Sequence, residues 1–283
     1  MSAQFLFLIL LLAGEQFTAC NFVSAQATRL WATYYGGAAE DGAYSDVATD
    51  ASDNVYLTGQ TLSALSIASG GSQNTWGGGP DAFLVKFNSA GARLWATYYG
   101  GTTDDYGLSV ATDAVTGDVY LAGITNSTSG IASGGFDNTY GGGGNNDAFL
   151  VKFNSSGVRQ WATYYGGTGY DIGNCVATDA SGNVYLVGST DNSTGIASGG
   201  FQNTYGGGFQ DAFLVKFNPS GVRQWATYYG GTGDDAGYSV AADGSGNVYL
   251  SGFTNSAASI ASGGFDNTYG GGGLNDAFLV KLN

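Results

Sequence analysis

A fourfold internal repeat constrains this chain more than any other feature of its sequence. The segment Trp-Ala-Thr-Tyr-Tyr-Gly-Gly occurs four times, and its copies start at Trp31, Trp95, Trp161 and Trp225. The copies are spaced by about 65 residues, the length of a supersecondary unit that buries its apolar faces by stacking on its neighbours. The fold must therefore be built from four nearly equal units.

Each unit contains four runs typical of β-strands and no amphipathic helical pattern. In the first unit the runs cover 44–49, 54–59, 82–88 and 93–101, and short turns of the Asp-Ala-Ser-Asp-Asn type separate some of them. Four antiparallel strands per repeat are typical of a β-propeller blade. The first run is made of small residues, which suits the crowded axis, and the aromatic side chains of the other runs would fill the wedges between blades. We predict an all-β, four-bladed β-propeller.

The order of the runs predicts how the ring closes. The copy at 29–37 precedes every other run, whereas the last unit has only three runs and stops after 277–282. Strand 29–37 is therefore expected to pair with 277–282, complete the last blade and close the ring, which removes an exposed sheet edge. The alternatives are an open array of blades and exchange of this strand between molecules.

The first 27 residues have the features of a secretory leader. An apolar run covers 5–13, which is shorter than the roughly 20 residues needed to span a bilayer, and Ala25-Gln26-Ala27 offers a small-x-small cleavage site. We predict a signal peptide at 1–27, a propeller domain at 28–283, no membrane span, and a secreted or cell-surface location. Lipoprotein anchoring at Cys20 and an uncleaved anchor remain as alternatives.

Charge and composition exclude several classes of function. The net charge is −14, and the eight basic residues all recur at equivalent positions of the repeat, so no basic patch is available for nucleic acid. The chain has no histidine, which excludes histidine-based catalysis and histidine metal ligands.

Acidic residues recur at three positions of the repeat. One set lies just before the axial run, where four carboxylates at the channel mouth could hold Ca²⁺; this set is Asp41, Asp105, Asp171 and Asp235. The alternative is that each of these caps its own glycine-rich turn. The set that contains Asp50 is expected to close the turn after the axial run. The set that contains Asp81 could pair with the arginine or lysine of its blade, although an exposed pair of this kind is worth under about 1 kcal/mol. No other cofactor is predicted.

The long connections of each blade are expected to share one face, because alternate connections of an antiparallel sheet lie at the same end. Loops on a rigid scaffold commonly carry binding residues. The candidates on this long-loop face are Glu40, Asp104, Asp234, Tyr140, Tyr205, Tyr269 and Trp76. The alternative for the repeated Ile-Ala-Ser-Gly-Gly-Phe part of the longer loop is that its isoleucine and phenylalanine tuck under the blade as anchors.

The repeat resembles a known family. Trp-Ala-Thr-Tyr-Tyr-Gly-Gly-Thr-Gly-Asp-Asp, then Ser-Gly-Asn-Val-Tyr-Leu, then Asp-Ala-Phe-Leu-Val-Lys-Phe-Asn is similar to the SBBP-type β-propeller repeat of bacterial secreted and surface proteins. The resemblance covers 29–283 and implies a β-propeller in an extracellular setting. It supplies no catalytic residues.

These observations lead to three hypotheses for function. The first is a non-enzymatic extracellular propeller that binds a protein or glycan through its long-loop face. The second is a filament or surface-layer subunit that assembles when strand 29–37 pairs with the next molecule. The third is a glycan-active lyase or hydrolase that uses paired carboxylates. It is the least favoured, because active sites usually break the symmetry that these carboxylates keep.

Overall fold

The computed structural model describes residues 27–42 and 46–283. The chain divides into two compact units, 1–32 and 33–283, and the blades belong to the second. Most of the predicted leader, including Cys20, lies outside the described residues. No helix among the described residues has the length and hydrophobicity that crossing a bilayer requires.

The described chain contains sixteen strands. Their bounds are β1 (Asp41–Gly42), β2 (Val47–Thr49), β3 (Val55–Thr61), β4 (Asp81–Phe87), β5 (Arg93–Tyr99), β6 (Asp105–Thr112), β7 (Val119–Thr125), β8 (Asp147–Phe153), β9 (Arg159–Tyr165), β10 (Asp171–Thr178), β11 (Val184–Thr190), β12 (Asp211–Phe217), β13 (Arg223–Tyr229), β14 (Asp235–Ala242), β15 (Val248–Thr254) and β16 (Asp276–Leu282).

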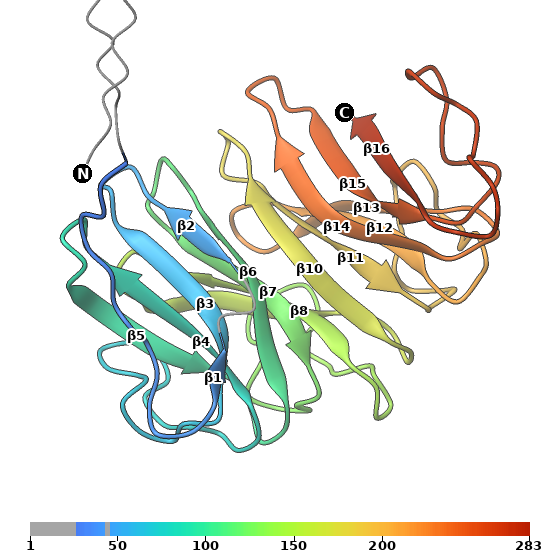
Figure 1. The fold of residues 1–283 in the computed structure, drawn as a ribbon. Helices are drawn as coiled ribbons and strands as arrows, with labels where there is room; N and C mark the ends of the chain where they lie inside the picture. Colours follow the sequence, from blue (N-terminus) through green and yellow to red (C-terminus); the bar gives the residue numbers. More distant parts are fainter. Residues whose placement is uncertain (1–26, 43–45) are drawn as a thin grey trace, which may run out of the picture. The chain divides into compact units, whose positions relative to one another are not determined.

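The strands form four antiparallel sheets, one per repeat (Figure 1). The second and third sheets run β6-β7-β8-β9 and β10-β11-β12-β13. In the first sheet β1 and β2 both pair with β3, and β4 and β5 follow. The fourth sheet holds β14, β15 and β16. This arrangement confirms the all-β, four-bladed propeller.

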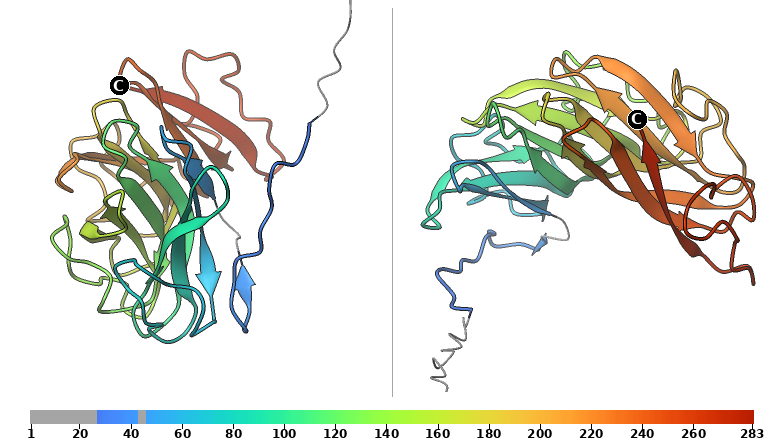
Figure 2. Two further views of the ribbon diagram at one scale, coloured as in Figure 1. Left: turned by 90° about the vertical axis from the view of Figure 1, so that its left-hand side faces the viewer. Right: turned by 90° about the horizontal axis from the view of Figure 1, so that it is seen from above.

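The first strand of each blade lies next to its counterparts in the neighbouring blades (Figure 2). The hydroxyl of Ser109 in β6 donates to Asp46 at 2.8 Å, and that of Thr178 in β10 donates to the carbonyl of Thr112 at 2.9 Å. A bulge between Gly107 and Ser109 shifts the register there. The small-residue run is therefore the inner strand, as predicted, although β6 already begins at Asp105.

Aromatic side chains fill the space between successive blades. Tyr99 of the first blade lies on Phe149 of the second, with ring centroids 5.1 Å apart, and its hydroxyl donates to the carbonyl of Ile131 at 2.7 Å. Within a blade, Trp95 meets Tyr56 edge-on at 6.1 Å. All five of these side chains are buried. Blade stacking thus buries the aromatic residues, as the sequence predicts.

The longer loop of each blade runs along the outer strand. Ser69 bridges to Ala96 of β5, and Ile67 is fully buried while its carbonyl accepts a 3.2 Å bond from Arg93. The predicted isoleucine anchor is confirmed here. The phenylalanines anchor less completely than the isoleucine, because Phe136 packs on Phe217 with ring centroids 6.3 Å apart but is 42% exposed, and Phe201 is 71% exposed.

Closure of the ring by 29–37 stays a prediction. The structure assigns no strand to this segment, and among the described residues β16 pairs with β15 alone. Tyr35 nevertheless packs on the first blade. Its ring lies 5.2 Å from that of Phe83, and its hydroxyl donates to the carbonyl of Ile67 at 2.6 Å. These are the contacts that Tyr99, in the fourth strand of its blade, makes with the blade that follows.

Candidate functional site

The four aspartates predicted to surround the channel mouth instead occupy separate junctions. Each receives the backbone N–H of the second glycine of the preceding Gly-Gly pair, at 2.7 or 2.8 Å; the residues are Asp41, Asp105, Asp171 and Asp235. The hydroxyl of Ser127 also donates to Oδ2 of Asp105 at 2.8 Å. In the described part of the chain no three acidic or cysteine side chains gather as a metal site. The expected ring of four is therefore not formed, and the alternative of turn caps is confirmed.

Asp105 meets a second carboxylate across the blade junction. Asp81, at the start of β4, and Asp105, at the start of β6, are both fully buried. A methyl group added to Gly100 would lie 2.6 Å from Oδ1 of Asp81 and 2.7 Å from Oδ2 of Asp105. Two carboxylate oxygens from adjacent blades thus face the same small space beside a glycine.

Equivalent buried aspartates occur at the next two junctions, and the space that two carboxylate oxygens share beside a glycine recurs at the third. At the third junction, a methyl group on Gly230 would lie 2.4 Å from Oδ1 of Asp211 and 2.9 Å from Oδ2 of Asp235. At the second, Asp147 and Asp171 are buried, and the charge of Asp171 contributes to the raised pKa of Asp147. We call these three pairs, Asp81/Asp105, Asp147/Asp171 and Asp211/Asp235, the junction carboxylates.

Burial makes the charged form of these groups costly. It raises the pKa of Asp81 to about 7, with a further contribution from the charge of Asp105. Burial likewise raises the pKa of Asp105 to about 6, against hydrogen bonds from Thr125, Gly101 and Ser127 that favour the anion. Oδ2 of Asp81 accepts the N–H of Gly77 at 2.8 Å, whereas Oδ1 has no hydrogen-bond partner. An unpartnered buried carboxylate oxygen is the chemically notable feature of this site.

The possible pairing of Asp81 and its equivalents with a lysine or arginine is not found in the described part of the chain. Within the described ranges, the lysines pair with aspartates at the opposite end of the strands; the pairs are Lys86–Asp50, Lys152–Asp118 and Lys216–Asp179, at 3.4, 2.9 and 4.0 Å. Asp50 also closes its own turn, as predicted, by accepting the N–H groups of Ser52 and Asn54 at 2.9 and 3.0 Å. The lysines therefore leave the junction carboxylates without a counter-charge.

The aromatic candidates of the long-loop face hold their own glycine-rich loops together. The indole of Trp76 donates to the carbonyl of Gly79 at 2.8 Å, and the hydroxyl of Tyr205 donates to that of Gly208 at 3.1 Å. Tyr140 and Tyr269 make the equivalent bonds to the carbonyls of Asn145 and Leu274. These rings remain partly exposed, so they staple the loop while presenting one edge to solvent.

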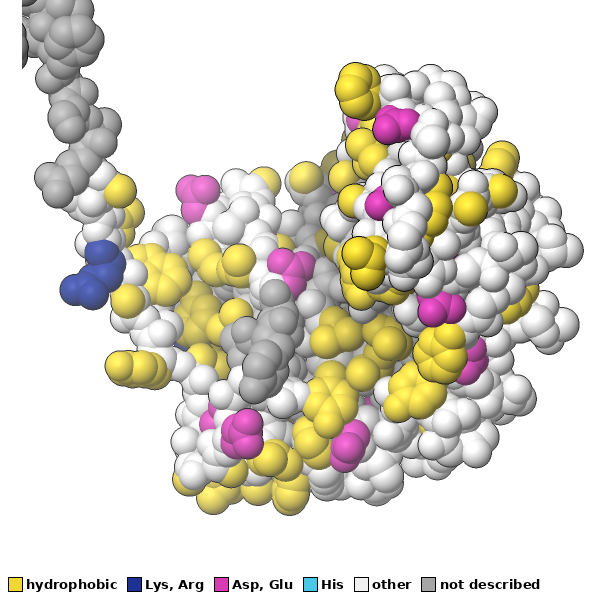
Figure 3. Space-filling model, turned by 45° about the vertical axis from the view of Figure 1, so that its right-hand side comes forward, with side chains coloured by type: hydrophobic (Ala, Val, Ile, Leu, Met, Phe, Trp, Pro, Cys, Tyr) yellow, Lys and Arg dark blue, Asp and Glu magenta, His cyan; other side chains and the backbone are white. Residues whose placement is uncertain are grey.

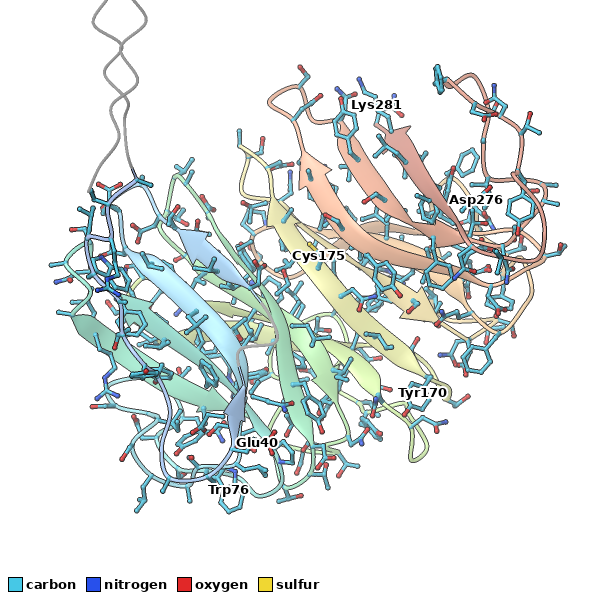
Figure 4. All side chains as sticks on the ribbon, in the orientation of Figure 1. Glu40, Trp76, Tyr170, Cys175, Asp276 and Lys281 are labelled. Atoms are coloured by element: carbon cyan, nitrogen blue, oxygen red, sulfur yellow. The ribbon has the colours of Figure 1, made fainter. Side chains whose placement is uncertain are left out.

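The acidic candidates of the same face are also at least partly exposed. Glu40 is exposed, and Asp104 and Asp234 are half-buried. Asp234 accepts the N–H of Phe209 at 2.5 Å, which ties the short connection before β14 to the long loop of the third blade. In Figure 4, Glu40 and Trp76 lie at the same end of the strands. The prediction that the two long connections share one face is therefore confirmed.

Two exposed aromatic residues on this face escaped the sequence analysis. Tyr170 is 45% exposed and Phe209 is 69% exposed. Tyr170 replaces the acidic residue that precedes the inner strand in the other blades, and Phe209 is an extra residue that follows Gly208, the equivalent of Gly79 in the first blade. The sequence signal for both residues is a departure from the repeat, whereas the predicted site residues are those that recur in several units.

Comparison with known proteins agrees with the blade structure. A family model described as a beta-propeller repeat, SBBP, matches residues 160–195 and 224–257. These two stretches are similar to the SBBP beta-propeller repeat. The two matches begin at the outer strands β9 and β13 and run through the inner strands β10 and β14 into β11 and β15, so one sequence repeat bridges two successive blades.

The chain is also similar to parts of two larger curated proteins. It is 23% identical over 260 residues to an uncharacterized WD repeat-containing protein, L264, of Acanthamoeba polyphaga mimivirus, a match that covers 78% of this chain. It is 27% identical over 176 residues to the regulatory protein FlaEY of Caulobacter vibrioides, covering 62% of this chain. Each match spans 18% of the relative's own length.

Proposed function

We propose that this propeller is a non-enzymatic extracellular interaction scaffold that binds a protein or glycan through its long-loop face. The observation that carries this proposal is the group of exposed aromatic side chains on that face: Trp76, Tyr170 and Phe209 are 36%, 45% and 69% exposed. In Figure 4, Trp76 and Tyr170 lie at the same end of the strands, although they come from different blades.

The physical setting of these side chains suits recognition. The loops that present them are tied down by the Trp76–Gly79 and Phe209–Asp234 hydrogen bonds, so little conformational entropy would be lost on binding. Aromatic rings combine a large apolar surface with rigidity, and they are enriched at binding hot spots. The acidic side chains Glu40, Asp104 and Asp234 accompany these rings on the long-loop face, and on the side of the molecule drawn in Figure 3 acidic side chains are likewise scattered among hydrophobic ones. A partner with an apolar centre and a neutral or basic rim fits this surface.

The comparisons support the scaffold class. The similarity to a propeller repeat and to a WD repeat-containing protein is in keeping with a scaffold, because in such folds a constant framework of blades carries variable loops, where function resides. The extracellular location is supported by the leader-like 1–27 and by the resemblance to secreted and surface proteins.

Replacing Trp76, Tyr170 and Phe209 with alanine tests the proposal. A labelled wild-type protein is applied to a glycan array and to the surface proteins of the producing cells, and bound targets are measured again with the triple variant. The matched control is Leu94→Ala, Val158→Ala and Val222→Ala, three similarly exposed apolar residues at the short-turn end. The proposal predicts that only the long-loop variant loses binding, by about tenfold or more. No binding by the wild type, or equal loss in both variants, would contradict it.

Self-assembly is a second candidate, favoured by the outer edge of β16. This strand pairs with β15 alone among the described residues, and an unpaired edge can template addition of another strand. Light scattering over a concentration series tests the idea, since growth of particle mass with concentration supports assembly and a constant monomer mass rejects it.

A further inference from the structure

Three blade junctions each bury two carboxylates, and among the described residues no lysine or arginine forms an ion pair with them. Asp81, Asp105, Asp211 and Asp235 are fully buried, and Asp147 and Asp171 are at most 1% exposed. Three of the lysines form ion pairs with other aspartates, and Lys281 lies over the ring of Tyr249. The arginines Arg93, Arg159 and Arg223 donate to the carbonyls of loop isoleucines.

Two adjacent buried negative charges are strongly unfavourable unless a positive charge is placed between them. At the first junction, Oδ2 of Asp81 and both oxygens of Asp105 are held by hydrogen bonds from Gly77, Gly101, Ser127 and Thr125. These donors favour the ionised form of both groups. Oδ1 of Asp81 alone has no partner, and it is directed at the space that it shares with Oδ2 of Asp105.

We propose that each pair of junction carboxylates binds one hard divalent cation of the Ca²⁺ class between two blades. The cation would replace the missing partner of Oδ1 on Asp81, Asp147 and Asp211. At the first junction its protein ligands would be Oδ1 of Asp81 and Oδ2 of Asp105, one from each blade, so the ion would join β4 to β6.

The donor atoms select the class of cation. The polar atoms nearest the Gly100 and Gly230 positions are carboxylate oxygens, and the chain has no histidine. Gln73 adds a further oxygen close by, because its Oε1 accepts the N–H of Gly100 at 3.3 Å, and Gln202 makes the same bond to Gly230. Oxygen-only sites with two carboxylates suit Ca²⁺ rather than zinc or copper.

The glycine at each junction is part of the same site. Gly100, Gly166 and Gly230 lie where a Cβ would come within 2.4–2.6 Å of a carboxylate oxygen. Glycine at this point leaves room beside both carboxylates, which a side chain would fill. A buried tyrosine also lies near each pair, since the charges of Asp81, Asp147 and Asp211 contribute to the raised pKa of Tyr98, Tyr164 and Tyr228.

The direct test is calcium binding by the full chain after EDTA treatment and dialysis. Isothermal titration calorimetry measures Ca²⁺ binding, and luminescence of Tb³⁺ sensitised by the neighbouring tyrosines measures it independently. The proposal predicts saturable binding of both ions, competition between them, and a rise in Tm on adding Ca²⁺. No heat, no sensitised Tb³⁺ emission and an unchanged Tm up to about 10 mM Ca²⁺ would overturn it, because that exceeds the range of even weak extracellular calcium sites.

A variant pair assigns the binding to these residues. Asp81→Asn, Asp147→Asn and Asp211→Asn together remove one charge from each junction, and they are expected to abolish Ca²⁺ binding and the Ca²⁺-dependent rise in Tm. The control combines Asp50→Asn, Asp113→Asn and Asp179→Asn, which change the net charge equally at the opposite end of the strands. Calcium binding retained by the control and lost by the junction variant supports the proposal. Equal loss of Ca²⁺ binding in both variants, or Ca²⁺ binding retained by the junction variant, would overturn the proposal. If either variant fails to fold, the titration of the wild-type protein decides.

Discussion

The ring of Tyr35 lies 5.2 Å from that of Phe83 at an angle of 45°, and Tyr99 lies 5.1 Å from Phe149 at 43°. The two tyrosines occupy the same position of the repeat, but Tyr99 is in the fourth strand of a complete blade, whereas Tyr35 precedes the first blade. Tyr35 therefore sits on the first blade as the fourth strand of a preceding blade would. This relationship supports the prediction that 29–37 serves as the missing strand of the last blade.

Tyr35→Phe tests whether the docking of Tyr35 on the first blade contributes to the free energy of unfolding. The substitution removes the 2.6 Å bond from the Tyr35 hydroxyl to the carbonyl of Ile67, and we expect a loss of about 1 kcal/mol in the free energy of unfolding. Tyr99→Phe is the matched control, because it removes the 2.7 Å bond to Ile131. Urea unfolding midpoints measure both. A destabilising Tyr99→Phe beside a neutral Tyr35→Phe would mean that the N-terminal segment does not dock in solution.

Gly100→Ala tests the packing of the junction carboxylates. The added methyl group would lie 2.6 Å from Asp81 and 2.7 Å from Asp105, closer than real Cβ contacts. We expect a loss of about 1–3 kcal/mol from overpacking. Gly244→Ala is the control, since nothing lies within 4 Å of its Cβ position. Thermal or urea unfolding compares the two, and equal stability of both variants would contradict the structure of the junction.

Phe136→Ala tests the contact between the loop of the second blade and the third blade. The guanidinium of Arg223 lies 4.3 Å from the centre of the Phe136 ring, and Phe217 lies 6.3 Å from it. Loss of these contacts is expected to cost about 1–2 kcal/mol. Phe209→Ala, at an exposed site on the long-loop face, should leave stability within about 0.5 kcal/mol of the wild type. A neutral Phe136→Ala would show that the loop does not brace the third blade.

The turn aspartates predict sensitivity to acid. Burial alone would raise the pKa of Asp50, but hydrogen bonds from Asn54, Ser52 and Tyr56 lower it to about 2, and the pKa of Asp179 is lowered by equivalent bonds that likewise outweigh burial. A carboxylate whose pKa is depressed by folding stabilises the fold above its ordinary pKa of 3.8 and loses that contribution as the pH falls through the folded value. Stability should therefore decline between about pH 4 and pH 2.

Replacing both turn aspartates checks the source of that decline. Asp50→Asn with Asp179→Asn should flatten the change in Tm between pH 5 and pH 2.5, because asparagine keeps the turn but does not titrate. Asp53→Asn, at an exposed position of the same turn, should keep the wild-type slope. An unchanged slope in the double variant would place the acid sensitivity elsewhere.

The repeat predicts most of the fold because a strand pattern that recurs four times admits few arrangements. The inner strand, the turn role of Asp50 and the anchoring role of Ile67 all follow from local sequence. The junction carboxylates do not, because Asp81 and Asp105 come from different blades and meet only after the blades stack. Tyr170 was not predicted because it departs from the repeat: the other three units have an acidic residue at its position.

The measurement that tests ring closure most directly is a disulfide between Thr33→Cys and Leu279→Cys, with Cys20 and Cys175 replaced by serine. Leu84 pairs with Thr97 in the first blade, so the equivalent residues of the closed last blade are Leu279 and Thr33. The control moves one cysteine out of register, as Tyr34→Cys with Leu279→Cys, because a shift of one residue directs the side chain to the other face of the sheet. Closure predicts that mild oxidation links the in-register pair within monomers and leaves the control reduced. A chain that stays reduced, or that links only between molecules, would contradict a ring closed by its own N-terminal strand.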